Sequence, residues 1–360
     1  MTEKLSHTSK PDPVPENTQN EEKKRAKKTE ISTIVHNDRT YLRYKSFAKN
    51  VLKFESDSDL HAYQLKSIGS GAFATGIFPV YSKSRRAVLA VKVSRVPKSS
   101  EKRTFPDDQL QREYRITRKL KHPNIRSALH HVCVGKLFSF LPLEFVHGSE
   151  LFTLMDEEWE SHMDGLRCDK SPEAMQSITA RRHIARGILK GLEFLHNRSI
   201  VHNDVKPENV LVGAKKMLEV NAATPVKLCD FGFSFVMNKE PPRFSGSQYY
   251  LCPDKLTQDV GLTCATDVFS FGVLMFALAS NLLPFTPDME RRNGNIQLKT
   301  MVTMREKLKF SYQKWFCYRE VRQVFLKATV LESARRPSAS KLLQLSFFTS
   351  EPIQLSLDTI

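Results

Sequence analysis

The chain has 360 residues, of which 40% are hydrophobic and 26% are charged, and its formal net charge is +16 at pH 7. These values are ordinary for a soluble globular protein, and the length allows one large domain or two lobes with a sizeable core. The N-terminus is polar and charged, so we expect no secretory signal. The six cysteines are scattered without metal-ligand spacing, which argues against a disulfide framework and against a cysteine-ligated metal site.

The first forty residues are rich in Pro, Glu, Lys, Asn, Ser and Thr and poor in large apolar side chains. Such a segment cannot bury enough surface to offset the entropy cost of ordering, so we predict a disordered basic tail over residues 1–45 and a lead-in segment over 46–62. Within the tail, the basic run Lys23–Lys28 is similar to a nuclear-import signal, although such clusters are common in flexible tails. We expect a cytoplasmic protein, with a nuclear location as the alternative.

Most of the net charge lies outside this tail. Ten basic and seven acidic residues give the tail only +3, which leaves +13 for residues 46–360. A basic surface can attract nucleic acid, an anionic membrane or an acidic protein. Because no nucleic-acid-binding motif accompanies the charge, we favour a solvated basic surface and do not expect nucleic acid as a partner.

Short, β-like runs begin at Tyr63 and define the first structural region. The pattern predicts one helix over Gln109–Leu120, which ends where Pro123 prevents continuation. Five strands are predicted, over Tyr63–Ile68, Ile77–Ser82, Ala87–Val93, Ala128–Val134 and Leu137–Phe145. We therefore expect a small, β-rich lobe with one main helix.

The chain becomes mainly helical after Gly148. A long helix is predicted over Ala174–Asn197, whereas residues 158–172 form a polar insertion that the pattern does not assign. The uncharged segment Val268–Pro287 is long enough for a membrane span, but serine, asparagine and proline residues interrupt it. We favour a buried helix at the centre of a large lobe and expect no membrane-spanning segment.

Two short stretches carry the clearest chemical signal. Val201–Asn209 reads Val-His-Asn-Asp-Val-Lys-Pro-Glu-Asn, and Cys229–Gly232 reads Cys-Asp-Phe-Gly. Together they resemble the catalytic loop and the metal-binding turn of protein kinases. The resemblance implies that Asp204 accepts the proton of the acceptor hydroxyl, and that Asn209 and Asp230 hold Mg²⁺ on the phosphates of ATP.

Further parts of the protein kinase pattern precede these stretches in the expected order. Lys92 is similar to the strand lysine that pairs with the α- and β-phosphates, and Glu113 is similar to the helix glutamate that fixes this lysine. The resemblance also implies that Ala90 contacts the bound nucleotide. A glycine-rich loop that covers the phosphates is formed, on the same resemblance, by Ile68, Gly69, Ser70, Gly71, Ala72, Phe73 and Ala74.

The junction between the two predicted lobes resembles the hinge that binds adenine. Leu143 stands at the gatekeeper position, and backbone groups around Glu144 and Val146 are expected to hydrogen-bond the base. Glu150 is similar to a glutamate that contacts ribose and a substrate arginine in arginine-preferring relatives. The resemblance adds Leu211 to the residues that contact the nucleotide.

Three features bear on the phosphate acceptor. Lys206 resembles the lysine that marks transfer to Ser or Thr rather than Tyr, and as a mobile point charge it is expected to steady the γ-phosphate. Gly246-Ser247 resembles the Gly-Thr pair that lines the acceptor site. Glu150, Glu208 and the acidic residues within 156–160 favour basic substrates, with a solvated acidic helix face as the alternative.

Several positions depart from the family pattern. Ala74 replaces a glycine, Gly76 stands where a valine usually packs on adenine, Thr117 replaces an apolar residue and Cys252 replaces an alanine. Asn203 stands where an arginine normally grips a phosphate on the activation loop. An amide cannot supply the charge or the forked donor geometry of arginine, so we predict that loop phosphorylation is not required for activity.

The resemblance also predicts two structural anchors. Asp254 is expected to pair with Arg336, and Asp267 is expected to hold the backbone of the catalytic loop. Because the ordered motifs span about residues 63–349, the chain is identified as a suspected member of the eukaryotic protein kinase family, Ser/Thr type.

Membership in that family implies an α+β, bilobal fold: a small β-rich N-lobe and hinge over 63–146, a larger, mostly helical C-lobe over 147–349, and a C-terminal tail over 350–360. The expected function is transfer of the γ-phosphoryl group of ATP, with Mg²⁺, to Ser or Thr of protein substrates. The alternatives are a catalytically weak or inactive kinase that serves as a scaffold, and a nucleic-acid or membrane binder built on the kinase fold. The sequence does not indicate an oligomeric state.

Overall fold

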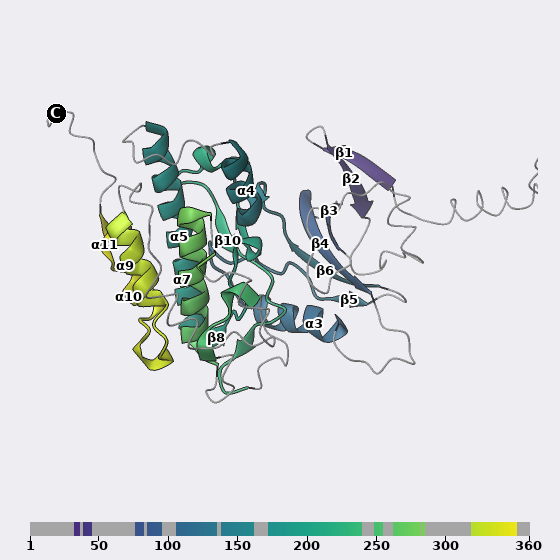
Figure 1. The fold of residues 1–360 in the computed structure, drawn as a ribbon. Coiled ribbons are helices and arrows are strands. Elements are labelled where there is room, and N and C mark those ends of the chain that lie inside the picture. Colours follow the sequence, from purple (N-terminus) through teal and green to yellow (C-terminus); the bar gives the residue numbers. More distant parts are fainter. Residues whose placement is uncertain are drawn as a thin grey trace, which may run out of the picture.

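A computed structural model shows a small β-rich lobe followed by a larger, mostly helical lobe (Figure 1). This arrangement confirms the predicted α+β, two-lobed fold. The structure describes residues 32–36, 39–44, 76–82, 85–95, 106–134, 138–161, 172–239, 248–254, 262–281, 283–284 and 318–350.

The smaller lobe is built on a six-stranded sheet with the strand order β1-β2-β3-β4-β6-β5. Neighbouring strands are antiparallel except for β2 and β3, which are parallel. In the register of β4 and β6, Ala90 lies opposite Leu143 and Lys92 lies opposite Leu141. Because alternate residues of a strand share a face, Ala90 and Lys92 project from the same side of the sheet. The strands are β1 (Ser32–His36), β2 (Arg39–Tyr44), β3 (Gly76–Ser82), β4 (Ala87–Arg95), β5 (Cys133–Val134) and β6 (Phe138–Glu144).

Strands β1 and β2 correct the prediction of a disordered tail for residues 32–36 and 39–44, and the other residues of the predicted tail 1–45 lie outside the described ranges. Both strands lie within that tail, and β2 pairs with β3 through contacts such as Leu42 opposite Val80. The composition of the whole tail masks a local run of β-branched and aromatic residues on either side of Asn37-Asp38. Pairing with an existing sheet edge supplies the backbone hydrogen bonds that the isolated run lacks.

The predicted strands and the helix of this lobe agree with the structure to different degrees. Strands β3, β4 and β6 lie where three of them were expected, but the predicted strand Ala128–Val134 shortens to β5 and one isolated bridge between Ala128 and Leu143. The predicted strand Tyr63–Ile68 lies outside the described residues. Helix α3 (Pro106–Thr117) begins and ends three residues earlier than predicted, and its first residue is a proline, whose fixed φ suits that position.

The larger lobe packs helices around one apolar core. Helix α7 contains the first part of the uncharged segment Val268–Pro287 and is buried on nearly every side, as predicted. Its C-cap residue, Asn281, has a left-handed conformation with φ 53°. Gly272 allows α9 to approach α7 closely, because a Cβ atom there would lie 2.7 Å from Thr329 and 2.8 Å from Ala328. The helices are α4 (Leu151–Ser161), α5 (Pro172–His196), α7 (Cys264–Ser280), α9 (Tyr318–Ala328), α10 (Ala339–Leu343) and α11 (Ser346–Thr349). Among the described residues, no helix combines the length and the apolar character that crossing a membrane requires.

Short strands position the loops that face the smaller lobe. Strands β7 (Ser149–Glu150), β9 (Val210–Val212) and β10 (Val226–Leu228) form one small sheet, with β9 in the middle. Strands β8 (Ile200–Val201) and β11 (Phe235–Val236) form a second one. These pairings place the loop after β8 next to the turn between β10 and β11, which are the two stretches with the clearest chemical signal.

Candidate active site

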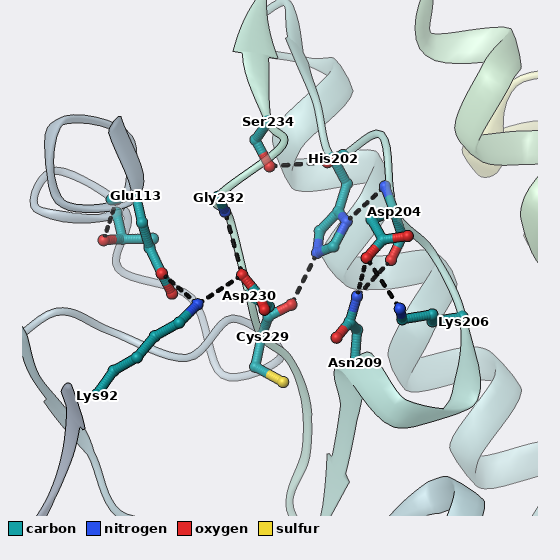
Figure 2. A network of polar contacts seen from close by, with 11 residues as sticks. Lys92, Glu113, His202, Asp204, Lys206, Asn209, Cys229, Asp230, Gly232 and Ser234 are labelled. Carbon is teal, nitrogen blue, oxygen red and sulfur yellow. Dashed lines mark hydrogen bonds and ion pairs between the residues drawn. The ribbon is translucent and has the colours of Figure 1, made fainter. Parts of the chain in front are cut away.

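Three charged side chains from separate parts of the chain meet between the lobes (Figure 2). The Nζ atom of Lys92, on β4, lies 2.9 Å from Oε2 of Glu113, on α3, and 2.8 Å from Oδ1 of Asp230, in the turn after β10. The side chains of Lys92 and Glu113 are 9% and 2% exposed, whereas that of Asp230 remains 25% exposed. The structure therefore brings together the predicted lysine, helix glutamate and metal-binding aspartate.

The electrostatics of this cluster keep the lysine charged. Burial alone lowers the pKa of Lys92, but the charges of Asp230 and Glu113 outweigh it and raise that pKa above its ordinary value. Burial likewise raises the pKa of Asp230, but the charge of Lys92 and hydrogen bonds from Lys92 and the Gly232 amide lower it overall. A charged ammonium group therefore faces an ionised carboxylate at neutral pH.

The catalytic loop places its predicted base beside an amide and a lysine. The Nδ2 atom of Asn209 donates to the carbonyl oxygen of Asp204 at 2.7 Å and to Oδ2 of the same residue at 2.8 Å. The Nζ atom of Lys206 lies 3.3 Å from that Oδ2 atom. A 3₁₀ turn over Pro207–Asn209 brings the asparagine back towards the aspartate. The Asp204 carboxylate is thus fixed in orientation and 6% exposed as a residue.

Asp267, in the first turn of α7, holds the backbone of this loop as predicted. Its carboxylate accepts hydrogen bonds from the amides of His202 and Asn203, at 2.8 and 2.7 Å, and from Nε2 of His196 at 2.9 Å. Burial alone raises the pKa of Asp267, but the hydrogen bond and charge of His196 lower it overall. Sequence reasoning missed His196, because nothing in the last turn of α5 indicates which distant carboxylate it reaches.

His202 joins the catalytic loop to the metal-binding turn. Its Nδ1 atom accepts from the Asp204 amide at 3.3 Å, so Nε2 carries the proton and donates to the Cys229 carbonyl at 3.0 Å. Its ring lies 4.9 Å from that of Phe231, and its carbonyl accepts from Oγ of Ser234. Burial raises the pKa of the Cys229 thiol to about 12, so this thiol stays protonated at neutral pH.

Asn203 makes a contact that differs in kind from the phosphate grip of the usual arginine. Its φ is 69°, in the left-handed region that asparagine tolerates better than most residues. Its Nδ2 atom donates to the Phe233 carbonyl at 3.1 Å, so the amide holds the segment just after the metal-binding turn directly. This contact requires no phosphate, and the independence of activity from loop phosphorylation stays a prediction.

The predicted hinge has a polar environment that sequence reasoning missed. The carboxylate of Glu144 lies 3.0 Å from Nζ of Lys227 and accepts from the Ser127 amide at 3.3 Å. The backbone carbonyl of Glu144 accepts from Nε of Arg126 at 2.9 Å. Leu143 is 2% exposed, and Val146 is half-buried. The structure therefore places Leu143, Glu144 and Val146 at the junction of the lobes, as expected.

An acidic group lies beside the catalytic loop. Glu150 pairs with Leu211 between β7 and β9, which places both predicted residues on the floor of the site. Burial and the charge of Glu208 raise the pKa of Glu150. Within the described residues, Oε2 of Glu208 is buried and has no hydrogen-bond partner. The carboxylates of Glu150 and Glu208 thus lie close enough to repel each other, and Oε2 of Glu208 is free to accept a hydrogen bond.

The predicted anchor in the larger lobe is also present. The Nη1 atom of Arg336 lies 2.5 Å from Oδ2 of Asp254. The guanidinium group also donates to the carbonyls of Val330, Leu331 and Ala265, and its side chain is fully buried. The shorter aspartate therefore reaches the arginine despite the loss of one methylene relative to glutamate.

Several predicted site residues lie outside the described part of the chain. These are the glycine-rich loop Ile68–Ala74 and the pair Gly246-Ser247, whose roles stay predictions. Ala90 is described, and it is fully buried beside Leu143 on the sheet face that carries Lys92.

The donor set fits Mg²⁺ better than a transition metal. Among the described residues, no three His, Cys, Asp or Glu side chains gather as a metal cluster. Asn209 uses its amide nitrogen for Asp204, which leaves Oδ1 for a cation, and Asp230 has a partly exposed carboxylate. A hard cation that keeps several waters and phosphate oxygens needs only one or two such protein ligands.

Comparisons with known proteins agree with this geometry. The model of the protein kinase domain family matches residues 63–348. The chain is 30% identical to "Calcium/calmodulin-dependent protein kinase type II" of Caenorhabditis elegans over 67% of its length, and that match covers 29% of the relative. It is 29% identical to "CBL-interacting protein kinase 8" of Oryza sativa subsp. japonica over 70% of its length, and 27% identical to "CBL-interacting serine/threonine-protein kinase 16" of Arabidopsis thaliana over 78%.

The matches cover 49% of the rice relative and 55% of the Arabidopsis one, so the chain spans about half or less of the curated relatives it matches. The family match, in contrast, extends over most of this chain and includes every residue of the cluster around Lys92, Asp204 and Asp230. The chain therefore belongs to the eukaryotic protein kinase family.

Proposed function

We propose that this chain is an ATP-dependent protein kinase that transfers the γ-phosphoryl group to Ser or Thr of protein substrates. The observation that carries the proposal is the position of Lys92, which lies within 2.9 Å of Glu113 and 2.8 Å of Asp230 although these residues come from different lobes. An ion pair inside one lobe can be merely structural. One ammonium group shared between a helix glutamate and the metal-binding turn is the arrangement that phosphate positioning requires.

Each residue of the site has a specific task in this proposal. Asp204, oriented by Asn209, accepts the proton of the acceptor hydroxyl, and Lys206 supplies positive charge next to it. Lys92 holds phosphate oxygens, while Asn209 and Asp230 hold Mg²⁺. The bound cation supplies neutralisation of the charge on the phosphates. Positioning and electrostatic stabilisation account for most of the expected rate enhancement.

A direct test uses the purified full chain after phosphatase treatment, with Mg·ATP and a library of Ser, Thr and Tyr peptides. We expect phosphorylation of Ser and Thr peptides without prior loop phosphorylation. Replacing Asp204 with alanine is expected to lower kcat by about 10²–10⁴-fold. Replacing Glu173, an exposed carboxylate on α5, with alanine serves as the control and should leave kcat unchanged. Transfer to tyrosine alone, or equal rates in the Asp204 variant, would contradict the proposal.

We further propose that the acidic group formed by Glu150 and Glu208 favours peptides with arginine near the acceptor residue. Replacing Glu208 with glutamine should raise KM for an arginine peptide by roughly tenfold or more, since charge-assisted hydrogen bonds contribute about 1.5–3 kcal/mol each. The exposed Glu173 on α5, changed to glutamine, is the control. Equal KM values for arginine and alanine peptides in the unchanged protein would contradict this preference.

The same acidic group predicts a pH dependence. Burial and the charge of Glu208 raise the pKa of Glu150, so its carboxylate takes up a proton at a higher pH than an ordinary glutamate. Because arginine binds the ionised form, KM for an arginine peptide should rise as the pH falls through the Glu150 pKa. KM for a neutral peptide should not change in parallel, and KM measured across this range for both peptides checks the sign.

The alternative function is that of a weakly active or inactive scaffold. Asn203, Thr117 and Cys252 depart from the family pattern and favour it. The complete set of lysine, base and metal ligands opposes it, because a scaffold has no chemical need for them. Binding of Mg·ATP without transfer to any peptide or to the chain itself would favour the scaffold.

A further inference from the structure

Arg126 places a buried guanidinium group against the predicted base-binding hinge. Its backbone amide donates to the Leu228 carbonyl at 2.9 Å, two residues before Asp230. Its Nε atom donates to the Glu144 carbonyl at 2.9 Å, and the residue is 6% exposed. Arg126 therefore lies between β10, the strand before the metal-binding turn, and the predicted hinge: its backbone bonds to the strand and its side chain to the hinge.

The surroundings of this group identify it as part of the site. The positive charge of Arg126 acts on Glu113 of α3, on Glu150 of β7 and on the thiol of Cys229, which belong to three different walls of the site. Within the described residues, no carboxylate lies at ion-pair distance from Arg126, and Nη1 and Nη2 have no hydrogen-bond partner. A largely buried cation thus keeps two donor groups unused.

The two unused donors of Arg126 can distinguish purine bases by the group at position 6. Adenine has an amino donor at position 6, whereas guanine and hypoxanthine have a carbonyl acceptor there, next to the N7 acceptor. The paired donors of arginine match an O6 and N7 edge, and this pairing contributes about 1–3 kcal/mol of discrimination against the wrong base in nucleic-acid recognition. An adenine amino group, in contrast, meets a donor and must share the Glu144 carbonyl with Arg126.

We propose that Arg126 sets the base preference of this site, which accepts 6-oxopurine nucleotides such as GTP and ITP at least as well as ATP. This inference rests on the proposed nucleotide-dependent function. It deepens that function, because it concerns which phosphoryl donor the site takes. Arg126 touches the base in this account and takes no part in the transfer step.

The test measures dissociation constants of the full-length protein for Mg²⁺ complexes of ATP, GTP, ITP and purine-riboside triphosphate, which lacks any group at position 6. Competition against a fluorescent nucleotide gives all four values without relying on turnover. For the unchanged protein we expect GTP and ITP to bind at least as tightly as ATP. Removal of the amino group from the base should not weaken binding. Tighter binding of ATP than of GTP and ITP would overturn the proposal.

Two variants test whether the guanidinium group of Arg126 causes the base preference. Arg126→Leu should shift the ratio of affinities towards ATP by roughly tenfold, as a discrimination of about 1.4 kcal/mol implies. Arg335→Leu, which removes an exposed arginine of the larger lobe, should leave the ratio unchanged. The same ratio in Arg126→Leu and in the unchanged protein would overturn the assignment to Arg126.

Failure of nucleotide binding and failure of the base preference are distinguishable. If neither the unchanged protein nor Arg126→Leu binds any Mg·nucleotide, the proposed function fails and the inference fails with it. If both bind nucleotides with one common adenine preference, only the inference fails. Should Arg126→Leu not fold, the four dissociation constants of the unchanged protein still decide the base preference.

Discussion

Replacing Lys92 with methionine is expected to lower kcat/KM for phosphoryl transfer by roughly 10²–10³-fold, the effect of losing one preorganised electrostatic contact. Methionine fills the space of the lysine stem but has no charge for the phosphates. Glu113 and Asp230, at 2.9 and 2.8 Å from the lost ammonium group, would then face each other without a cation. Steady-state kinetics with Mg·ATP and an accepted peptide measure the effect.

A matched control separates this loss from general damage. Lys190 is exposed on α5, and its change to methionine should leave kcat/KM unchanged. Glu113→Gln keeps a hydrogen-bond acceptor but removes its charge. Its kcat/KM should therefore lie between the values of Lys92→Met and Lys190→Met. An Lys92→Met enzyme that is as active as the Lys190 variant would contradict the proposed site, provided that both unfold at similar urea concentrations.

Replacing Arg336 with leucine should lower the free energy of unfolding by about 3–5 kcal/mol, because removing one partner of a buried ion pair leaves an uncompensated charge. Asp254 loses its partner at 2.5 Å, and the carbonyls of Val330, Leu331 and Ala265 lose their donor. The apolar replacement itself is compatible with the site, so the loss of pairing dominates. Urea unfolding at neutral pH measures the change.

Arg335, the residue before Arg336, provides the control for the change in the free energy of unfolding. Arg335 forms a longer contact of 3.7 Å with Glu332, and both side chains are about 70% exposed. Arg335→Leu should therefore change the free energy of unfolding by less than about 0.5 kcal/mol. The double variant Arg336→Leu with Asp254→Leu should recover part of the loss, since it removes the uncompensated charge. Equal effects of the two single variants would show that the buried pair does not stabilise the lobe.

The chemical core of the site could be predicted from sequence because its residues stand in short, ordered motifs. Asp204 and Asn209 lie five residues apart, so local geometry alone brings their side chains together. Lys92 and Asp230 lie 138 residues apart, and only the resemblance to a known family predicted their contact. Residue type and order sufficed here because phosphoryl transfer leaves few alternatives for these positions.

The remaining features depend on contacts that no local pattern encodes. Arg126 follows an apolar isoleucine and has no motif of its own, so its approach to the Glu144 carbonyl emerges only when β6 closes on the loop before β5. The strand pair β1 and β2 was missed because strand formation depends on an available partner edge more than on composition. Helix α3 shifted by three residues because its start is set by Pro106 rather than by the apolar repeat.

The most direct test is an experimental structure of the full chain with Mg²⁺ and a non-hydrolysable nucleoside triphosphate. The account predicts that Lys92 Nζ lies about 2.7–3.2 Å from an α- or β-phosphate oxygen. It also predicts that Asn209 Oδ1 and an Asp230 carboxylate oxygen lie about 2.0–2.1 Å from the cation. A nucleotide bound elsewhere, or a triphosphate that contacts neither Lys92 nor Asp230, would contradict the central claim.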